Sequence, residues 1–135
     1  MTSSGLAGLV ASESTEQPNG LTDSAPVLRV NDLQTVFHTQ SGTVHAVNGV
    51  SFDLWPGELL GVVGESGSCK SVTMMSLVKL LPIPPAEIMS GSVHYHDQDL
   101  LQLSPEALRQ LRGGDIGFIF QAPMPSLNPV FTVGY

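Results

Sequence analysis

The sequence predicts an α/β fold, and three observations support this. Residues 28–37 and 44–54 alternate between apolar and polar side chains, as half-buried strands do. Residues 58–63 contain the apolar, β-branched run that is typical of a strand buried on both faces. A glycine-rich loop then leads to residues 70–81, where apolar residues form a stripe along a helix. A strand, a loop and a helix in this order are typical of an α/β unit.

Local signals place further elements around this unit. Residues 1–26 are rich in serine, threonine, glycine, glutamate and proline, and we expect a disordered tail there. Gln40-Ser41-Gly42 is the expected turn between the first two strands. The prolines of the segment 82–85 are expected to end the helix.

The last third of the chain contains three more expected elements. Residues 92–96 have the pattern of a strand. Ser104 is a good N-cap, and the proline after it suits the first helical position, so we expect a short helix that ends at Leu111. Residues 116–120 are the strand expected before Gln121.

Residues 64–71 carry the clearest chemical signal. They have the spacing of a phosphate-binding loop, which is a glycine, four residues, a glycine, a lysine and a serine or threonine. Backbone N–H groups of such a loop form an anion nest, and the start of the following helix adds partial positive charge. Lys70 is expected to reach the β- and γ-phosphates of ATP, and the Ser71 hydroxyl to ligate Mg²⁺. The predicted ATP-binding residues of the loop are Gly64, Glu65, Ser66, Gly67, Ser68, Cys69, Lys70 and Ser71.

Cys69 stands where the motif has its second glycine. If this position requires a positive φ, a residue with a Cβ costs about 1–2 kcal/mol there, which would weaken binding about 5- to 30-fold. The alternative to a nucleotide site is a glycine-rich turn between a strand and a helix that binds nothing.

Composition excludes several other classes of function. The net charge is −7 with five basic residues, too few for a basic patch, so we expect no nucleic-acid partner. The single cysteine excludes an intrachain disulfide and suits a reducing cytosol. No apolar run approaches the roughly 20 residues of a membrane span. Attachment to a membrane would therefore require a partner protein.

With these features, the chain resembles the ATP-binding subunit of ABC transporters, in the branch that imports dipeptides, oligopeptides and nickel. The likeness covers about residues 27–135, which we expect to form part of a nucleotide-binding domain. The blocks that carry it, besides the loop, are Val36-Phe37-His38-Thr39, Gly42-Thr43-Val44-His45-Ala46-Val47, Val50-Ser51-Phe52-Asp53-Leu54, Gly57-Glu58, Ile116-Gly117-Phe118-Ile119-Phe120-Gln121-Ala122-Pro123-Met124 and Ser126-Leu127-Asn128-Pro129. The resemblance implies a P-loop NTPase (RecA-like) core with an antiparallel β-subdomain.

The resemblance also implies roles for single residues. Gln121 matches the Q-loop glutamine, which in the family contacts Mg²⁺ or the attacking water, and residues 124–128 would face membrane subunits. Phe37 matches the aromatic residue that stacks on adenine, and the alternative is a core phenylalanine at the end of a strand. Partners implied by the family are ATP, the permease subunits and a second ATP-binding subunit. The implied location is the cytoplasm, at the inner face of the cell membrane.

Three features depart from the family pattern. Ala122 replaces the usual aspartate and Pro125 the usual threonine, which puts the partner-facing loop in doubt. Three family motifs do not occur in the 135 residues. They are the Leu-Ser-Gly-Gly-Gln signature, the Mg²⁺-binding aspartate with its catalytic glutamate, and the switch histidine. We therefore expect this polypeptide alone not to hydrolyse ATP at a useful rate, because a general base contributes about 10²- to 10⁴-fold. The alternative is a remnant that binds nucleotide or docks on a membrane subunit without turnover.

Overall fold

The computed structural model describes residues 25–121. The chain divides into two compact units, with the boundary in the sequence between Leu103 and Ser104. Each unit is described by itself. The expected tail, apart from residues 25 and 26, lies outside the described residues. The predictions on Ala122, Pro125 and the partner-facing loop also lie outside them.

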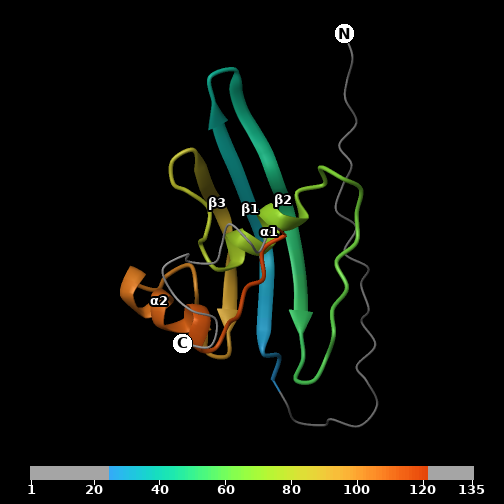
Figure 1. Cartoon of the computed structure of the whole chain (residues 1–135), viewed down its shortest axis with the longest axis vertical. Helices are drawn as coiled ribbons and strands as arrows, with labels where there is room; N and C mark the ends of the chain where they lie inside the picture. The colour runs from blue at the N-terminus through green and yellow to red at the C-terminus, as the bar shows by residue number, and fades with distance from the viewer. Residues whose placement is uncertain (1–24, 122–135) are drawn as a thin grey trace, which may run out of the picture. The chain divides into compact units, whose positions relative to one another are not determined.

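The first unit is built on a four-stranded antiparallel sheet with strand order β2-β1-β3-β4 (Figure 1). The strands are β1 (Leu28–Thr39), β2 (Gly42–Leu54), β3 (Ala86–Tyr95) and β4 (Gln98–Asp99). Pairing of Thr39 with Gly42 closes the β1–β2 hairpin where the sequence predicts a turn. The α/β class and the antiparallel β-subdomain are thus confirmed.

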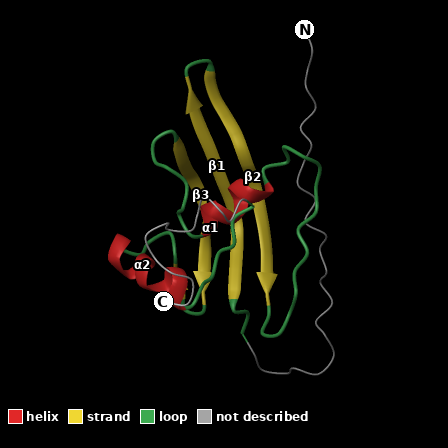
Figure 2. Cartoon of the chain, in the orientation of Figure 1, coloured by secondary structure: helices red, strands yellow, loops and turns green. Residues whose placement is uncertain are grey.

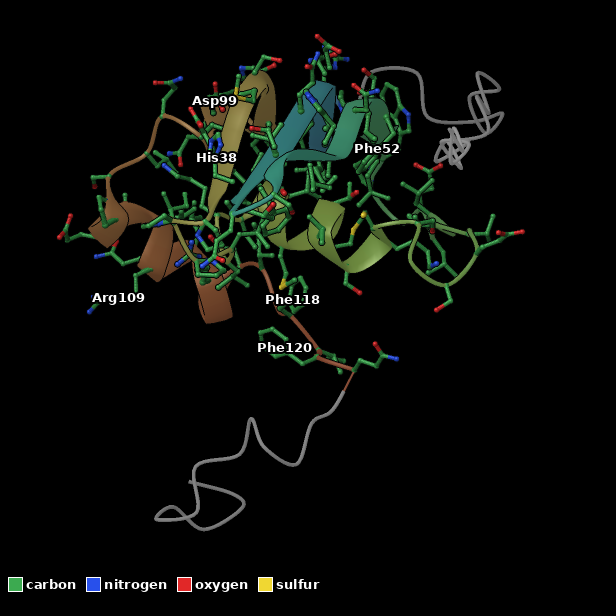
Figure 3. All side chains as sticks on the ribbon, turned by 90° about the horizontal axis from the view of Figure 1, so that it is seen from above. His38, Phe52, Asp99, Arg109, Phe118 and Phe120 are labelled. Carbon is green, nitrogen blue, oxygen red and sulfur yellow. The ribbon has the colours of Figure 1, made fainter. Side chains whose placement is uncertain are left out.

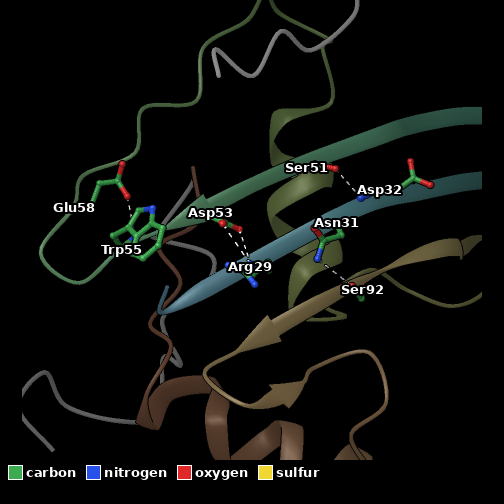
Figure 4. Close-up of polar contacts among 8 residues, drawn as sticks. All are labelled: Arg29, Asn31, Asp32, Ser51, Asp53, Trp55, Glu58 and Ser92. Carbon is green, nitrogen blue, oxygen red and sulfur yellow. Dashed lines mark hydrogen bonds and ion pairs between the residues drawn. The ribbon is translucent and has the colours of Figure 1, made fainter. Parts of the chain in front are cut away.

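Strand β1 is interrupted by a bulge at Asp32, whose φ is 43°. The register with β3 shifts between Asn31 and Gln34, so β1 carries an extra residue there. The backbone N–H of Asp32 donates to the hydroxyl of Ser51 on β2 at 2.8 Å, which satisfies an amide that the ladder leaves unpaired (Figure 4). On the other side of the bulge, the backbone of β1 passes close to Gly91 of β3.

Helix α1 (Lys70–Leu77) packs against β1 and β2 and helps to cover the apolar core (Figure 1). A buried hydroxyl pair joins the two elements, with Thr35 Oγ1 3.0 Å from Ser76 Oγ. Because the Ser76 hydroxyl donates its one proton to the carbonyl of Val72 at 2.7 Å, Thr35 is the donor of the pair. The buried apolar side chains of this unit are Val30, Leu33, Val36, Val47, Val50, Leu77, Val78, Leu81, Ala86, Val93 and Leu100.

The helix begins at Lys70 as predicted but ends earlier, at Leu77. Val78 is its C-cap residue, and Lys79 has a φ of 51°, which the right-handed helix cannot continue through. The prolines of 82–85 therefore do not end the helix, because the chain has already turned before it reaches them. The strand expected at 92–96 is also longer than predicted. It is β3, which runs from Ala86 to Tyr95.

Residues 58–63 do not form the predicted strand. After β2 the chain turns through Pro56 and Gly57, where the backbone N–H of Trp55 donates to Glu58 Oε2 at 2.8 Å (Figure 4). It then runs without regular structure to the helix (Figure 2). Leu59 is 96% exposed and Val63 77%. A parallel strand needs neighbours to pair with its backbone groups, and no described strand pairs with this segment.

The second unit, described from Ser104 to Gln121, contains α2 (Pro105–Gly114). The Ser104 hydroxyl accepts from the backbone N–H of Ala107 at 3.3 Å, which confirms the predicted cap. Arg112 and Gly113 have non-helical dihedral angles, so the regular helix ends at Leu111 as expected.

The prediction of a strand at 116–120 is also wrong. As at 58–63, no described strand pairs with the segment. Ile116 makes a single β-bridge with Arg112, and the residues after it have no regular structure. The rings of Phe118 and Phe120 contact each other, with centroids 4.9 Å apart (Figure 3), whereas Ile119 is 92% exposed. An apolar run can form a strand only beside a partner strand, and none of the described residues supplies one here.

Candidate phosphate-binding loop

The loop of residues 64–71 joins the irregular segment after β2 to the first turn of α1. A tight turn forms its centre, in which the backbone N–H of Ser68 donates to the carbonyl of Glu65 at 3.1 Å. Gly67 lies inside this turn with a φ of 86°, a conformation that glycine adopts at no steric cost. The loop is therefore compact, although the strand expected to lead into it does not form.

Lys70 lies at the centre of the loop. Its Nζ donates to the carbonyl oxygens of Gly64 and Glu65, both at 2.7 Å, and to the hydroxyl of Ser68 at 3.0 Å. The ammonium group is thus held where the loop closes, and its contact with phosphates stays a prediction. Sequence analysis predicted the lysine but not these oxygen partners, because side-chain contacts inside a loop depend on its closed conformation.

Gly64, the first glycine of the motif, has little space for a side chain. A Cβ at this position would lie 2.5 Å from Ser68 Oγ and 3.7 Å from Lys70 Nζ. The Ser68 side chain therefore lies directly over Gly64 and would have to move if this residue had a Cβ, whereas Lys70 would be in ordinary van der Waals contact.

Cys69 is the N-cap residue of α1, with a φ of 59° and a ψ of 24°, in the left-handed region. The condition that sequence analysis set for a cost at this position, a positive φ, is therefore met. Its carbonyl accepts from both the backbone N–H and the hydroxyl of Thr73, at 2.9 and 3.0 Å. The start of α1 is thus well formed although Cys69 has a Cβ. The Cys69 thiol lies 3.6 Å from the carbonyl oxygen of Gly67. Sequence analysis missed Thr73, although its spacing of four residues from Cys69 is a usable signal.

The other predicted residues lie outside the centre of the loop. Ser71 is exposed in the first turn of α1. Phe37 is half-buried on β1, where it pairs with Val44 of β2 and Ala86 of β3, so both interpretations of this residue stay open. Gln121 is exposed and belongs to the second unit. The structure therefore brings Gly64, Glu65, Ser68 and Lys70 together, whereas the pairing of Ser71 with Gln121 around Mg²⁺ stays a prediction.

The loop fits a polyphosphate better than it fits a metal held by protein ligands. A close glycine, a left-handed residue at the helix start and a lysine ammonium suit an anion with several oxygens. Among residues 25–121, no three histidine, cysteine, aspartate or glutamate side chains gather to hold a metal ion. A Mg²⁺ ion here would therefore have to depend on phosphate oxygens and a hydroxyl such as that of Ser71.

The described part of the chain contains no helix that combines the length and the apolar character required to cross a bilayer.

Comparison with known proteins identifies the family. Residues 47–134, which include the whole loop, match the ABC transporter family. The chain is 52% identical over 112 residues to the peptidoglycan transport ATP-binding protein YejF of Agrobacterium fabrum, covering 83% of this chain and 20% of that protein.

Two relatives from Bacillus subtilis are nearly as similar. The dipeptide transport ATP-binding protein DppD is 50% identical and the oligopeptide transport ATP-binding protein OppD 47% identical, each over 108 residues and 80% of this chain. The chain covers 32% and 30% of their lengths, so it spans between a fifth and a third of the relatives named here. The family match and these identities show that the chain belongs to the ABC transporter family.

Proposed function

We propose that the whole protein is the ATP-binding subunit of an ABC importer of peptides, which couples ATP binding and hydrolysis to transport. The closed loop with Lys70 at its centre carries the proposal, because it combines a lysine ammonium with a glycine cradle at a helix start. The names of DppD and OppD support peptides as the solute class.

In this proposal each residue acts through ordinary electrostatics. Lys70 neutralises the β- and γ-phosphates, and the amides of the loop bind the remaining oxygens. Ser71 would supply a hydroxyl ligand to Mg²⁺, and Gln121 would contact that ion or position water. Phe37 stacks on adenine, and such stacking is worth about 1–3 kcal/mol. Bound Mg²⁺ supplies charge neutralisation for the transferred phosphoryl group.

We further propose that the 135-residue polypeptide binds MgATP without turnover. The 135 residues include the predicted phosphate-binding residues but no signature motif, no paired aspartate and glutamate after an apolar strand, and no switch histidine. A second candidate function is a nucleotide-binding or permease-docking remnant that never hydrolyses ATP. The partners proposed for the whole protein are the permease subunits and a second ATP-binding subunit, at the cytoplasmic face of the membrane.

Calorimetric titration of the polypeptide with MgATP tests the binding proposal, and phosphate release measured in parallel tests turnover. We expect saturable binding to one site with no phosphate release above the background hydrolysis of ATP. Absence of binding heat and of any nucleotide-dependent change in unfolding temperature would contradict the binding proposal. Sequencing the gene beyond codon 135 separates the two functions, because a downstream frame with the signature motif favours the importer subunit.

Replacement of Cys69 by glycine is expected to stabilise the fold more than it tightens binding. The left-handed conformation of Cys69 costs about 1–2 kcal/mol, and this strain belongs to the folded loop itself. Since glycine loses more chain entropy on folding, we expect Cys69→Gly to raise the free energy of unfolding by about 0.5–1 kcal/mol. MgATP affinity should change by less than about threefold.

Urea unfolding and calorimetry on the same samples check this prediction. Cys69→Ala is the control, since it removes the thiol but keeps the Cβ and the strained backbone, and it should resemble the unmodified chain in both measurements. A gain in affinity of tenfold or more for Cys69→Gly alone would mean that the Cβ obstructs the phosphate directly.

A further inference from the structure

The buried polar side chains of the first unit lie on the two elements that pack against each other, β1 and α1. They are Thr35 on β1, and Thr73 and Ser76 on α1, and none of them is more than 1% exposed. The other buried side chains described in this unit are apolar. A hydroxyl in such surroundings is costly unless it is hydrogen-bonded, so valine or alanine would fill these positions at less risk. Thr73 is explained by its bond to the carbonyl of Cys69, whereas Thr35 and Ser76 need a separate explanation.

Thr35 and Ser76 form a directed link between the strand and the helix. The Thr35 hydroxyl donates to Ser76 Oγ at 3.0 Å, and Ser76 Oγ donates to the carbonyl of Val72 at 2.7 Å. Apolar contacts are non-directional, so by themselves they allow a helix of eight residues to shift or rotate on a sheet. A hydrogen bond between buried groups requires one distance and one direction, and it therefore holds α1 at one position on β1.

Both ends of this link carry residues of the proposed nucleotide site. Thr35 lies two residues before Phe37 and therefore on the same face of β1, since neighbouring residues of a strand point to opposite faces. Ser76 belongs to the helix that begins with Lys70 and Ser71. The bond between Thr35 and Ser76 thus joins the strand of the proposed adenine-stacking residue to the helix of the proposed phosphate-binding residues.

We propose that Thr35 is a positioning residue for nucleotide binding, whose hydrogen bond to Ser76 sets the distance between the ring of Phe37 and the phosphate-binding loop. A ligand that contacts both places gains from a distance that is already set, whereas a ligand that contacts the loop alone does not. The inference rests on the proposed function for the nature of the ligand. The hydrogen bond itself is testable without any nucleotide.

Urea unfolding of single and double variants tests the bond without ligand. Ser76→Ala leaves the Thr35 hydroxyl buried without an acceptor, because this hydroxyl has no other partner among the described residues. Thr35→Val removes the hydroxyl together with its need for a partner, and Ser76 keeps its bond to Val72. We therefore expect Ser76→Ala to lower the urea midpoint more than Thr35→Val, and the double variant to be more stable than Ser76→Ala alone. Additive losses in the double variant would overturn the inference.

Calorimetry with two ligands tests the positioning role. MgATP is the probe for the loop and the base-stacking residue together, and magnesium tripolyphosphate is the probe for the loop alone. We expect Thr35→Val to weaken MgATP binding by about 3- to 10-fold, the effect of one hydrogen bond, and to leave tripolyphosphate binding within about twofold. Thr35→Ser, which keeps the hydroxyl, should keep the original ratio of the two affinities.

Val93→Ala is the control for a general loss of stability. Val93 is fully buried on β3, so this change removes buried methyl groups but leaves the bond between Thr35 and Ser76 in place. We expect a lower urea midpoint with an unchanged ratio of affinities.

Three results would overturn the positioning role and leave the proposed function standing. They are unchanged affinities in Thr35→Val, an equal loss for both ligands in that variant, and the same change of ratio in Val93→Ala. Absence of binding of either ligand by the unmodified chain would instead overturn the proposed function and the positioning role together.

Discussion

Lys70→Ala is expected to lower the affinity of the chain for MgATP by at least about 100-fold, as measured by calorimetry. Charge-assisted hydrogen bonds are worth about 1.5–3 kcal/mol each, and the lysine is proposed to make at least two with the β- and γ-phosphates. Their combined loss, about 3–6 kcal/mol, corresponds to a factor of about 10² to 10⁴ in the dissociation constant.

Lys79→Ala is the matched control, since it removes the same charge from a lysine whose Nζ donates to the carbonyl of Leu101 at 3.2 Å, away from the loop. Its affinity should stay within about twofold of the unmodified chain. Lys70→Arg should also bind poorly, because a planar guanidinium does not fit three oxygens arranged around a compact ammonium. Comparable losses in Lys70→Ala and Lys79→Ala would mean that net charge, and not the loop, governs binding.

The hairpin and the start of the phosphate-binding helix could be predicted because their signals are local. Alternation over 28–37 and 44–54 depends only on which face of each strand is buried, and the turn at Gln40-Ser41-Gly42 fixes their register. Lys70 begins α1 as the glycine-rich spacing requires. The positive φ at Cys69 follows from the glycine that the motif has at that position.

The elements that were mispredicted depend on partners distant in sequence. Residues 58–63 and 116–120 have the composition of buried strands, but a parallel strand forms only where neighbouring strands accept its backbone groups. The strand predicted to begin at Ser92 is β3, which begins six residues earlier, at Ala86. The prediction was late because Ser90-Gly91 has the composition of a turn. The oxygen partners of Lys70 could not be predicted either, since they exist only in the closed loop.

Gly91→Ala is expected to destabilise the first unit by about 2–5 kcal/mol, because it violates two constraints at once. Gly91 has a φ of 108°, which residues with a Cβ rarely adopt. A Cβ there would also lie 2.6 Å from Leu33 Cα, 2.7 Å from the carbonyl oxygen of Asp32 and 2.8 Å from that of Asn31. All three are backbone atoms of the β1 bulge, so they cannot move aside as a flexible side chain would.

The loss is measurable as a lower urea midpoint, followed by the fluorescence of Trp55 at the end of β2. Gly42→Ala separates the two causes, because Gly42 has a φ of 130° but a Cβ there would meet no atom within 4 Å. We expect Gly42→Ala to cost about 1 kcal/mol, the backbone term alone, and Gly91→Ala to cost at least twice as much. Since β1 at the bulge pairs with both β2 and β3, a displaced bulge disturbs both ladders. Equal losses in the two variants would show that β1 yields to the new methyl group, and the close approach at Gly91 would then not limit the stability of the sheet.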